Sequence, residues 1–400
     1  MISLGRSKEQ VIDRIVRHIS RRSVFSILFR AYATVVIIAI IDYVTGPYLS
    51  LLVFYLIPII ITSWFVGRRA GLLISLVSSI GCSIHDALFF PVSSSHTVIS
   101  WLVLLWNPLI SFGVFLIVAY TLSAMRRAMD EKLHFEFKVA AEVQSRLFPQ
   151  SLPPMKTLAY TAFCKPAATV SGDYYDAILI KPDTLGIALG DIAGKGISAA
   201  LLTANLQGLV RSFAPRHCDN VAELMSSVNN SLYNCTDSSK FATLFYGLYD
   251  DTNQTLTYVN AGHNPPIIFK RKNNHTAQNI NQTTNSLLFD GKAIEDDYFF
   301  DIIRIETGDT VIGAFSNAIY KPQTIQLHSG DTLILFTDGL SDARNFIHEE
   351  YGEERLTAIV SSNLHLSSQS LHDLILDDVS QFIGGGIQFD DITLIVAKVN

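Results

Sequence analysis

Apolar residues dominate the first third of the chain. Between Ala31 and Met125 only four residues are charged, and clusters containing Gly, Pro or polar residues interrupt the apolar sequence at intervals. Each uninterrupted stretch is close to the ~20 residues that a helix needs to cross the hydrocarbon core of a membrane. The pattern therefore predicts a transmembrane domain over residues 25–122, with four spans at about 25–43, 48–66, 71–90 and 98–122.

Basic residues are distributed unevenly around these spans. Residues 1–24 carry six Lys or Arg against two acidic residues, and basic pairs follow the second and fourth spans at positions 68–69 and 126–127. The segments 42–47 and 91–97 contain neither Lys nor Arg. Because Lys and Arg concentrate in cytoplasmic loops, we expect a multi-pass protein of the cytoplasmic membrane with both termini inside.

This topology places three ionisable residues, Asp42, His85 and Asp86, near the outer ends of their spans. Ionisable residues within a membrane domain often mark ligand or ion sites, whereas residues at span ends also serve as interfacial anchors. The sequence leaves both alternatives open, a sensor site and a set of anchors.

The pattern changes beyond residue 122 to a mixture of charged and apolar positions. Residues 123–148 contain neither Pro nor Gly and carry apolar residues near helical spacing, which predicts a helix that leaves the membrane. The Pro-containing segment 149–154 ends it, so residues 123–154 form a predicted linker. Residues 155–400 have the pattern of a soluble domain with short strands and two groups of helices.

A β-hairpin with an acidic residue at each outer end is predicted within this soluble domain. Two apolar runs, 177–180 and 185–189, flank a Lys-Pro-Asp-Thr turn. Asp173 precedes the first run and Asp191 follows the second, and antiparallel pairing brings the outer ends of a hairpin together. Paired carboxylates at one sheet edge are hard oxygen ligands for Mg²⁺ or Mn²⁺. A surface hairpin with ordinary acidic ends is the alternative.

More acidic residues occupy strand ends later in the chain. Asp338 follows one predicted strand, and Asp390 and Asp391 open the last one. Four acidic positions of this kind in one domain predict a two-metal site that holds a phosphoryl group and lowers the pKa of a bound water. Residues 271–300, rich in Asn and Thr, predict a mobile excursion. Strands are expected near 159–164, 242–249, 255–259, 331–337 and 392–399, and helices near 197–213, 220–235, 353–362 and 370–383.

Composition narrows the function classes. The net charge of −6 provides no basic surface suited to nucleic acid. The four cysteines form no CxxC pair, which argues against a zinc site or a disulfide framework. Charged residues make up 16% of the chain, against roughly a quarter in ordinary soluble domains, as expected for a protein with a membrane domain.

Residues 139–399 contain seven short motifs. They are EVQSRLFP (142–149), SGDYYD (171–176), GDIAGKGISAALL (190–202), FATLFY (241–246), NAGHNPP (260–266), LFTDGLSD (335–342) and DDITLIV (390–396). These motifs resemble, in the same order, those of the SpoIIE/RsbU-type serine/threonine phosphatases of the metal-dependent PPM (protein phosphatase 2C-like) clan. The fold this resemblance implies is α+β, an α/β/β/α sandwich with the metals at one end of two sheets.

The resemblance implies a site for two Mn²⁺ or Mg²⁺ ions and a role for each acidic position. Asp191 matches the aspartate that bridges the metals, and the backbone carbonyl of Ile192 is an added ligand. Asp173 matches the residue that contacts one metal directly or through water. Two aspartates precede the last strand, and the match to the family's motif leaves open which of them corresponds to the metal ligand. The implied metal ligands are Asp173, Asp191, Ile192, Asp338 and either Asp390 or Asp391, with Asp173, Asp191 and Asp338 as catalytic residues.

The activity implied is that of a membrane-bound, metal-dependent protein serine/threonine phosphatase in bacterial signal transduction. A metal-activated water attacks a phosphoserine or phosphothreonine without forming a phosphoenzyme. The implied substrate is a regulator protein, a STAS-type anti-anti-sigma factor. His263 either contacts the substrate or braces its own loop as a hydrogen-bonded turn residue. A catalytically inactive module that binds a partner protein is the alternative, against which the retention of all four carboxylate positions argues.

In the resembling family, a helix at the position of residues 123–148 helps to set dimerisation. We therefore expect a homodimer through the linker helix. Leu133, Phe137 and Leu147 are the expected apolar contacts, although they could instead pack on their own subunit.

Overall fold

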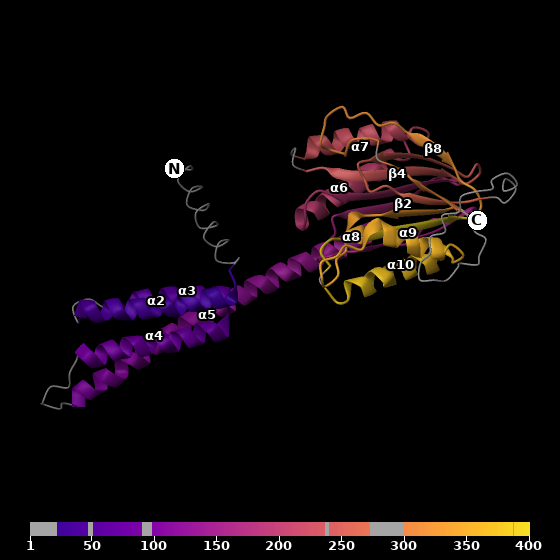
Figure 1. Cartoon of the computed structure of the whole chain (residues 1–400). Coiled ribbons are helices and arrows are strands. Elements are labelled where there is room, and N and C mark those ends of the chain that lie inside the picture. Colours follow the sequence, from indigo (N-terminus) through magenta and orange to yellow (C-terminus); the bar gives the residue numbers. More distant parts are fainter. Residues whose placement is uncertain are drawn as a thin grey trace, which may run out of the picture. The chain divides into compact units, whose positions relative to one another are not determined.

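The computed structural model describes residues 22–46, 51–89, 98–236, 240–272, 300–306, 308–386 and 388–400. The chain divides into two compact units, Met1–Phe135 and Glu136–Asn400 (Figure 1). Three expectations lie outside the described residues: the basic N-terminus over 1–21, the loop at 91–97 and the interior of the predicted excursion, 273–299.

The first unit is helical. Its described elements are α2 (Val24–Thr45), the short 3₁₀ helix η2 (Leu52–Tyr55), α3 (Leu56–Phe65), α4 (Arg68–Phe89) and the first part of α5 (Val98–Leu147). Side chains from all five elements share one apolar core, which includes the fully buried Tyr55, Ile59, Ile74 and Phe115.

Among the residues that the structure describes, two helices are long and apolar enough to cross a membrane, α2 and the Leu105–Leu147 part of α5. Only 22% and 17% of their most apolar windows are buried, so large apolar side chains face outward. A core helix of a soluble protein buries most of its apolar surface instead, and this exposure indicates membrane association. The expected second span contains the apolar helix Leu52–Phe65, which is shorter than the ~20 residues of a spanning helix. Four spans therefore stay a prediction.

The predicted linker helix is continuous with the predicted fourth span. Both belong to α5, a helix of 50 residues with Pro108 inside it. The boundary between the two compact units falls within α5, after Phe135. Pro108 and Gly113 lie within the apolar part of α5. From Gly113 to the end of the helix at Leu147 the chain contains no further Gly or Pro.

The second unit is a sandwich of two five-stranded sheets. All neighbouring strands pair antiparallel. One sheet has the order β1 (Leu158–Lys165), β10 (Ile392–Val399), β9 (Thr332–Phe336), β6 (Ile267–Arg271), β7 (Phe300–Arg304). The other has the order β2 (Asp173–Lys181), β3 (Thr184–Ile192), β4 (Ala242–Asp250), β5 (Thr255–Ala261), β8 (Gln323–Gln326).

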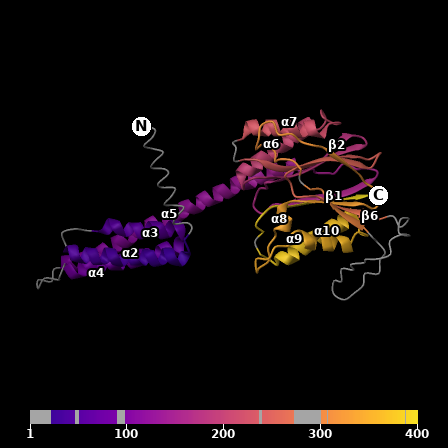
Figure 2. The same ribbon diagram turned by 45° about the horizontal axis from the view of Figure 1, so that its top comes forward.

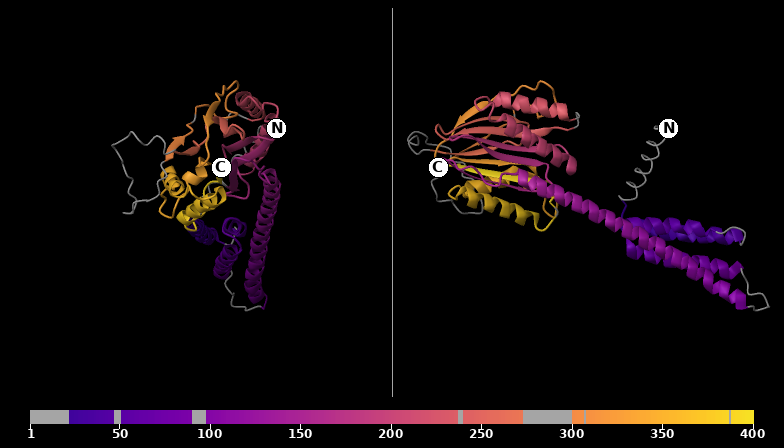
Figure 3. Two further views of the ribbon diagram at one scale, coloured as in Figure 1. Left: turned by 90° about the vertical axis from the view of Figure 1, so that its right-hand side faces the viewer. Right: turned by 180° about the vertical axis from the view of Figure 1, so that it is seen from behind.

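Helices cover both outer faces of the sandwich (Figures 2 and 3). α6 (Ile197–Phe213) and α7 (Val221–Cys235) pack on the β2–β8 sheet, while α9 (Gly352–Ser362) and α10 (Ser368–Ile383) pack on the other sheet. A third apolar cluster fills the space between the sheets and includes the fully buried Leu189, Phe245 and Leu335. The layers are α/β/β/α, as the resemblance implied.

Local sequence patterns predicted most of these elements. The expected strands and helices all occur, with bounds that differ by a few residues. β6, β7, β8 and the one-turn helix α8 (Asp338–Ser341) were not predicted, because each is five residues or shorter and carries little periodicity. The predicted excursion 271–300 is wrong at its two ends, since Arg271 and Phe300 pair with each other in β6 and β7.

Candidate metal centre

The predicted hairpin brings its two acidic ends together. β2 and β3 pair antiparallel, and Asp173 is the register partner of Asp191. The β3 strand ends in the turn Ala193–Gly196, where Gly194 and Gly196 adopt φ of 119° and 76°. Residues with side chains rarely adopt such angles, so these glycines allow the chain to turn at once into α6. The prediction that both carboxylates lie at one sheet edge is confirmed.

Asp191 lies in a concentration of negative charge. Burial, followed by repulsion from Asp338, Asp390 and Asp391, raises its pKa to about 7. A carboxyl group is protonated more easily when water is excluded and like charges are near. These residues come from β3, from the end of β9 and from the start of β10, so the two sheets contribute acidic groups to one place.

Asp338 joins this cluster through a close approach of two backbones. It is the first residue of α8, directly after β9 and Thr337, and burial and the nearby Asp390 raise its pKa. A Cβ atom on Gly339 would lie 1.9 Å from the carbonyl oxygen of Asp391. Only glycine fits there, and this lets the α8 turn pack against the segment that carries Asp390.

The doubled aspartate divides into two roles. Asp391 is 9% exposed. Its carboxylate accepts three hydrogen bonds, from Ala167 N at 2.7 Å, Ser171 Oγ at 2.9 Å and Gly172 N at 2.6 Å. Asp390 instead pairs with the exposed Lys195 ammonium, with Oδ2 and Nζ 2.9 Å apart. The geometry favours Asp390 as the metal ligand and Asp391 as the residue that fixes the loop before β2.

Asp173 is held by two hydroxyl groups from the opposite sheet. Its Oδ2 accepts hydrogen bonds from Thr337 Oγ1 at 2.8 Å and Thr393 Oγ1 at 2.5 Å. Only 2% of the residue is exposed, and this burial raises its pKa well above the usual range. Asp173 therefore links the two sheets at the edge where the acidic residues meet.

The acidic side chains of this cluster fit divalent cations by their chemistry, and less well by their present arrangement. Hard carboxylate oxygens are the ligands that Mg²⁺ and Mn²⁺ prefer, and the mutual repulsion that raises the pKa of Asp191 is the kind that a cation relieves. Among the residues that the structure describes, however, no three His, Cys, Asp or Glu side chains are arranged so that they could hold one ion.

Comparison with known families agrees with this geometry. Residues 181–400 match the family described as Stage II sporulation protein E (SpoIIE). This chain belongs to the SpoIIE family. The match covers β3, β9 and β10, and hence Asp191, Asp338 and Asp390.

Relatives of this SpoIIE-family chain include proteins from two bacteria. Protein IcfG of Synechocystis is 28% identical over 291 residues, which cover 66% of this chain and 42% of IcfG. The phosphoserine phosphatase RsbU of Bacillus subtilis is 27% identical over 283 residues, 70% of this chain and 75% of RsbU. The chain thus spans less than half of the length of IcfG.

A solved structure shares the fold of the second unit. The SiaA-PP2C domain of Pseudomonas aeruginosa aligns with a TM-score of 0.54 and 17% identity, over 68% of this chain and 99% of that domain. At this identity the likeness shows the fold alone, a PP2C-like phosphatase fold with two antiparallel sheets.

His263, for which two roles were open, lies inside the protein. It is 1% exposed, and its Nδ1 is 2.9 Å from Thr243 Oγ1. The side chain of Asn260 accepts from the His263 N–H and donates to its carbonyl oxygen, which closes the turn. Burial lowers the pKa of the imidazole to about 3, so the ring is uncharged near neutral pH. The contacts favour the loop-bracing role over substrate contact.

Gln144, a residue that sequence reasoning did not single out, connects α5 to the acidic edge. Its Nε2 donates to Ser171 O at 2.7 Å and its Oε1 accepts from Ser171 N at 2.8 Å. Ser171 and Gly172 in turn hold Asp391. The sequence signal was its place in the EVQSRLFP motif, where the glutamine is the polar residue of a helix face that is otherwise apolar.

Asp176, the second acidic residue of the SGDYYD motif, has a structural role. It is fully buried, and Arg211 of α6 binds both of its oxygens, at 2.7 and 3.0 Å. The Tyr174 hydroxyl donates to it at 3.3 Å. These contacts tie α6 to β2 and leave Asp176 outside the acidic cluster.

We expect Asp176→Asn to lower the free energy of unfolding by about 2 kcal/mol, because a buried charge-assisted pair is weakened. Phosphatase turnover of the folded variant should stay within about twofold of the parent, since Asp176 touches no cluster residue. Chemical denaturation and steady-state assays measure the two quantities. Unchanged stability, or a loss of turnover above tenfold in folded protein, contradicts the structural role.

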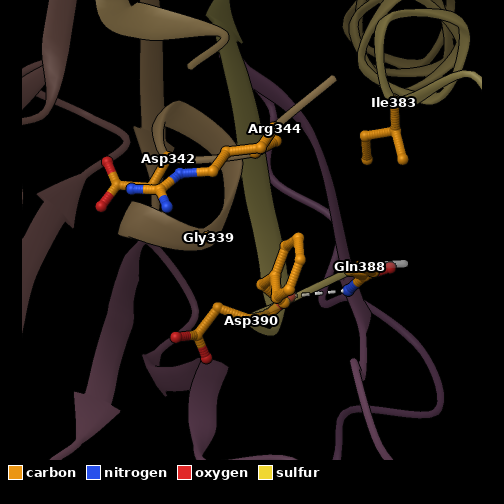
Figure 4. Close-up of a pocket in the computed structure, with 8 residues that line it drawn as sticks. Gly339, Asp342, Arg344, Ile383, Gln388 and Asp390 are labelled. Atoms are coloured by element: carbon orange, nitrogen blue, oxygen red, sulfur yellow. Dashed lines mark hydrogen bonds between the residues drawn. The ribbon is translucent and has the colours of Figure 1, made fainter. Parts of the chain in front are cut away.

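A pocket adjoins the acidic cluster on the side of Asp390 (Figure 4). It has a volume of about 240 Å³. The Gln388 amide donates to the Asp390 carbonyl oxygen at 2.8 Å along one wall, and Arg344 and Ile383 lie across from it. Phe389, 60% exposed, stands at the pocket beside Asp390. The full lining is Gly339, Asp342, Ala343, Arg344, Ile383, Gln388, Phe389 and Asp390.

Proposed function

We propose that this chain is a membrane-bound, metal-dependent protein serine/threonine phosphatase. The observation that carries the proposal is the cluster of Asp191, Asp338 and Asp390, which meet from both sheets at one edge of a sandwich that belongs to the SpoIIE family. The relative RsbU, named a phosphoserine phosphatase, supports the reaction class.

In this proposal Asp191, Asp338 and Asp390 hold two divalent cations, Mn²⁺ or Mg²⁺, with the Ile192 carbonyl as a further ligand. Such cations, when bound, supply an activated water and neutralise the charge on the phosphoryl oxygens. Asp173, fixed by its two threonine partners, would contact one of these cations directly or through water. Lys195 positions the Asp390 carboxylate from the glycine turn.

The substrate of this activity is a phosphoserine or phosphothreonine on a folded regulator protein, such as a STAS-type anti-anti-sigma factor. Two features support a protein substrate. The pocket beside Asp390 has room for a neighbouring side chain, and Phe389, Phe346 and Ile347 expose 60%, 83% and 56% of their surface on the segments that line or follow that pocket. Exposed apolar side chains of this size are typical of protein contact sites.

Phe389→Ala should raise the KM for a phosphorylated protein about tenfold, because an aromatic contact residue is worth about 1–2 kcal/mol at an interface. The turnover of p-nitrophenyl phosphate, which is too small to need that contact, should change less than twofold. Phe315→Ala is the matched control. Phe315 is 61% exposed, like Phe389, but it lies in a loop that is bound to α7, where the Asn229 side chain donates to the Phe315 carbonyl oxygen. Equal effects of Phe389→Ala on both substrates would remove Phe389 from substrate docking.

In this proposal the first unit anchors the enzyme in the bacterial cytoplasmic membrane by four spans, with both termini in the cytoplasm. The apolar exposure of α2 and α5 supports the membrane part of this proposal, and the basic residues at 68–69 and 126–127 support the orientation. The domains in this scheme are the basic N-terminus 1–24, the spans 25–122, the linker 123–154 and the phosphatase 155–400.

A homodimer through α5 completes the proposal. Apolar side chains recur along the described linker part of this helix with their surfaces uncovered, among them Met129 at 54%, Leu133 at 45% and Val143 at 59% exposure. Phe137 and Leu147, expected contacts together with Leu133, are half-buried within their own chain. A second copy of α5 is a partner that matches a helical apolar row of this kind.

The test of the function is phosphate release from a phosphoserine-containing STAS-type protein by the purified full chain in detergent. We expect release that requires Mn²⁺ or Mg²⁺, stops with EDTA and does not extend to phosphotyrosine peptides. Binding of the phosphoprotein without any phosphate release, at saturating metal, would instead favour the partner-binding module.

A further inference from the structure

A cavity of about 210 Å³ lies in the first unit, apart from the phosphatase site. Four elements contribute to its wall: α2, η2, α4 and α5. The lining residues are Asp42, Leu52, Cys82, His85, Asn107, Ile110 and Ser111. Five of the seven are polar or ionisable, in a helical unit whose shared core is apolar.

The cavity contains a buried carboxylate. Asp42 is 4% exposed, and its Oδ1 accepts the backbone N–H of Leu51 at 3.2 Å. Burial of a charged group in an apolar helical unit is costly, so such residues in membrane proteins usually face a ligand, an ion or a water-filled space. An interfacial anchor would expose its carboxylate instead. The burial of Asp42 therefore favours the ligand-site alternative over the anchor alternative for Asp42 and His85; the Asp86 side chain lies outside the described residues.

The remaining lining residues define what the cavity can accept. Neither Lys nor Arg is among them, and Asp42 is the carboxylate of the wall, which favours a cation over an anion. Asn107 and Ser111, one turn apart on α5, present an amide and a hydroxyl, and the Ser111 hydroxyl donates to the Asn107 carbonyl at 2.8 Å. Leu52 and Ile110 supply an apolar surface. Three metal-ligating side chains arranged around one ion are absent from the described residues, which disfavours a chelated metal.

Size limits the occupant to a small molecule. An apolar cavity of about 150 Å³ accommodates a benzene molecule, so 210 Å³ has room for a compact organic group with a few polar contacts. We propose that this cavity is a binding site for a small organic cation, an ammonium or guanidinium compound, whose charge pairs with Asp42 and whose N–H groups reach Asn107 and Ser111. The first unit is then a receptor for a small cationic solute, an inference that does not depend on the phosphatase activity.

Cys82 provides a probe inside the cavity. It is 8% exposed and lines the wall with Asp42. In the full chain with Cys164, Cys218 and Cys235 replaced by Ser, Cys82 is the sole thiol. Its labelling by cationic 2-aminoethyl methanethiosulfonate and by anionic 2-sulfonatoethyl methanethiosulfonate can be followed by mass spectrometry in detergent at pH 8, where histidine side chains are ordinarily neutral.

The cationic reagent should react roughly tenfold faster than the anionic one, after correction for their rates on free cysteine, because of the nearby carboxylate. Methylammonium and guanidinium should slow labelling in a saturable way, whereas ethanol should not. Asp42→Asn should remove both the discrimination and the protection. Asp130→Asn, the same change at an exposed residue of the same unit, should keep both.

Ser111→Phe serves as a second variant that keeps the charge and fills the space, and it should slow both reagents. Equal reaction of the two reagents in the parent chain would overturn the proposal, as would discrimination that survives Asp42→Asn. Cys82 that stays unlabelled by either reagent would also overturn it. If Asp42→Asn fails to fold, protection by methylammonium but not by ethanol in the parent chain decides the question.

Discussion

Asp191→Asn is expected to lower metal-dependent turnover of a phosphoserine protein about a thousandfold, or by about 4 kcal/mol of transition-state stabilisation. Asp191 is the member of the cluster whose pKa is raised, beyond the effect of burial, by the charges of Asp338, Asp390 and Asp391. Loss of its charge removes the ligand shared by the cations in the proposed site. Steady-state phosphate release at saturating Mn²⁺ measures the effect.

The same substitution should leave the metal-free fold intact. Because the folded-state pKa of Asp191 is raised to about 7, the metal-free protein loses stability as pH rises from about 4 to 7 and the folded carboxyl group ionises. Asparagine carries no such charge, so the metal-free variant should be at least as stable as the parent at pH 8. Thermal unfolding in EDTA checks this.

Asp219→Asn is the matched control for Asp191→Asn. Asp219 pairs with Lys181 on the surface, where 81% of the Asp219 side chain is exposed. It should change neither turnover nor metal dependence. Near-normal turnover of Asp191→Asn in folded, metal-loaded protein would contradict the assignment of Asp191.

Gln144→Ala should lower the free energy of unfolding of the second unit by about 3 kcal/mol, because two hydrogen bonds are lost and a buried N–H and C=O of Ser171 are left unsatisfied. The loop that holds Asp391 should loosen, and with it the position of Asp390. We therefore expect the Mn²⁺ concentration for half-maximal activity to rise about tenfold, a change of about 1.4 kcal/mol. Denaturant unfolding and metal titrations of activity measure the two effects.

Gln150→Ala is the control for Gln144→Ala. Gln150 is exposed, and its amide donates to Ser145 O and Phe148 O at the end of the same helix. It should leave metal dependence unchanged. An unaltered Mn²⁺ requirement in Gln144→Ala would show that α5 does not influence the metal centre through Ser171.

The contact between Gln144 and Ser171 also indicates how the membrane unit could act on the enzyme. α5 is one continuous helix from the apolar part of the chain to Leu147, three residues beyond Gln144. A shift of that helix by a signal would change the Gln144 hydrogen bonds to Ser171. Two packings that differ by a few kcal/mol are sufficient for such a switch.

Local features of the site could be predicted from the sequence. The β2–β3 hairpin depends on two apolar runs and a turn within 20 residues, so the pairing of Asp173 with Asp191 followed from spacing alone. The same holds for α6, whose observed bounds Ile197–Phe213 match the expected ones. Both elements are determined by residues close together in the chain.

Features that depend on distant residues could not be predicted. Asp391 bonds to Ser171, 220 positions earlier, and this contact separates its role from that of Asp390. No periodicity or spacing encodes which of two adjacent aspartates turns toward a remote loop. The burial of His263, which the turn motif alone left open, likewise results from the packing of the two sheets.

In the proposed function, the acidic edge of the sandwich holds divalent cations that drive phosphate release. The direct test is a calorimetric titration of the metal-free full chain with Mn²⁺, with phosphate release from a phosphoserine protein measured on the same samples. We expect two Mn²⁺ ions per chain, activity that rises with their occupancy, and loss of both the binding and the activity in Asp191→Asn. Phosphate release that proceeds without bound metal, or Mn²⁺ binding that Asp191→Asn leaves unchanged, would contradict it.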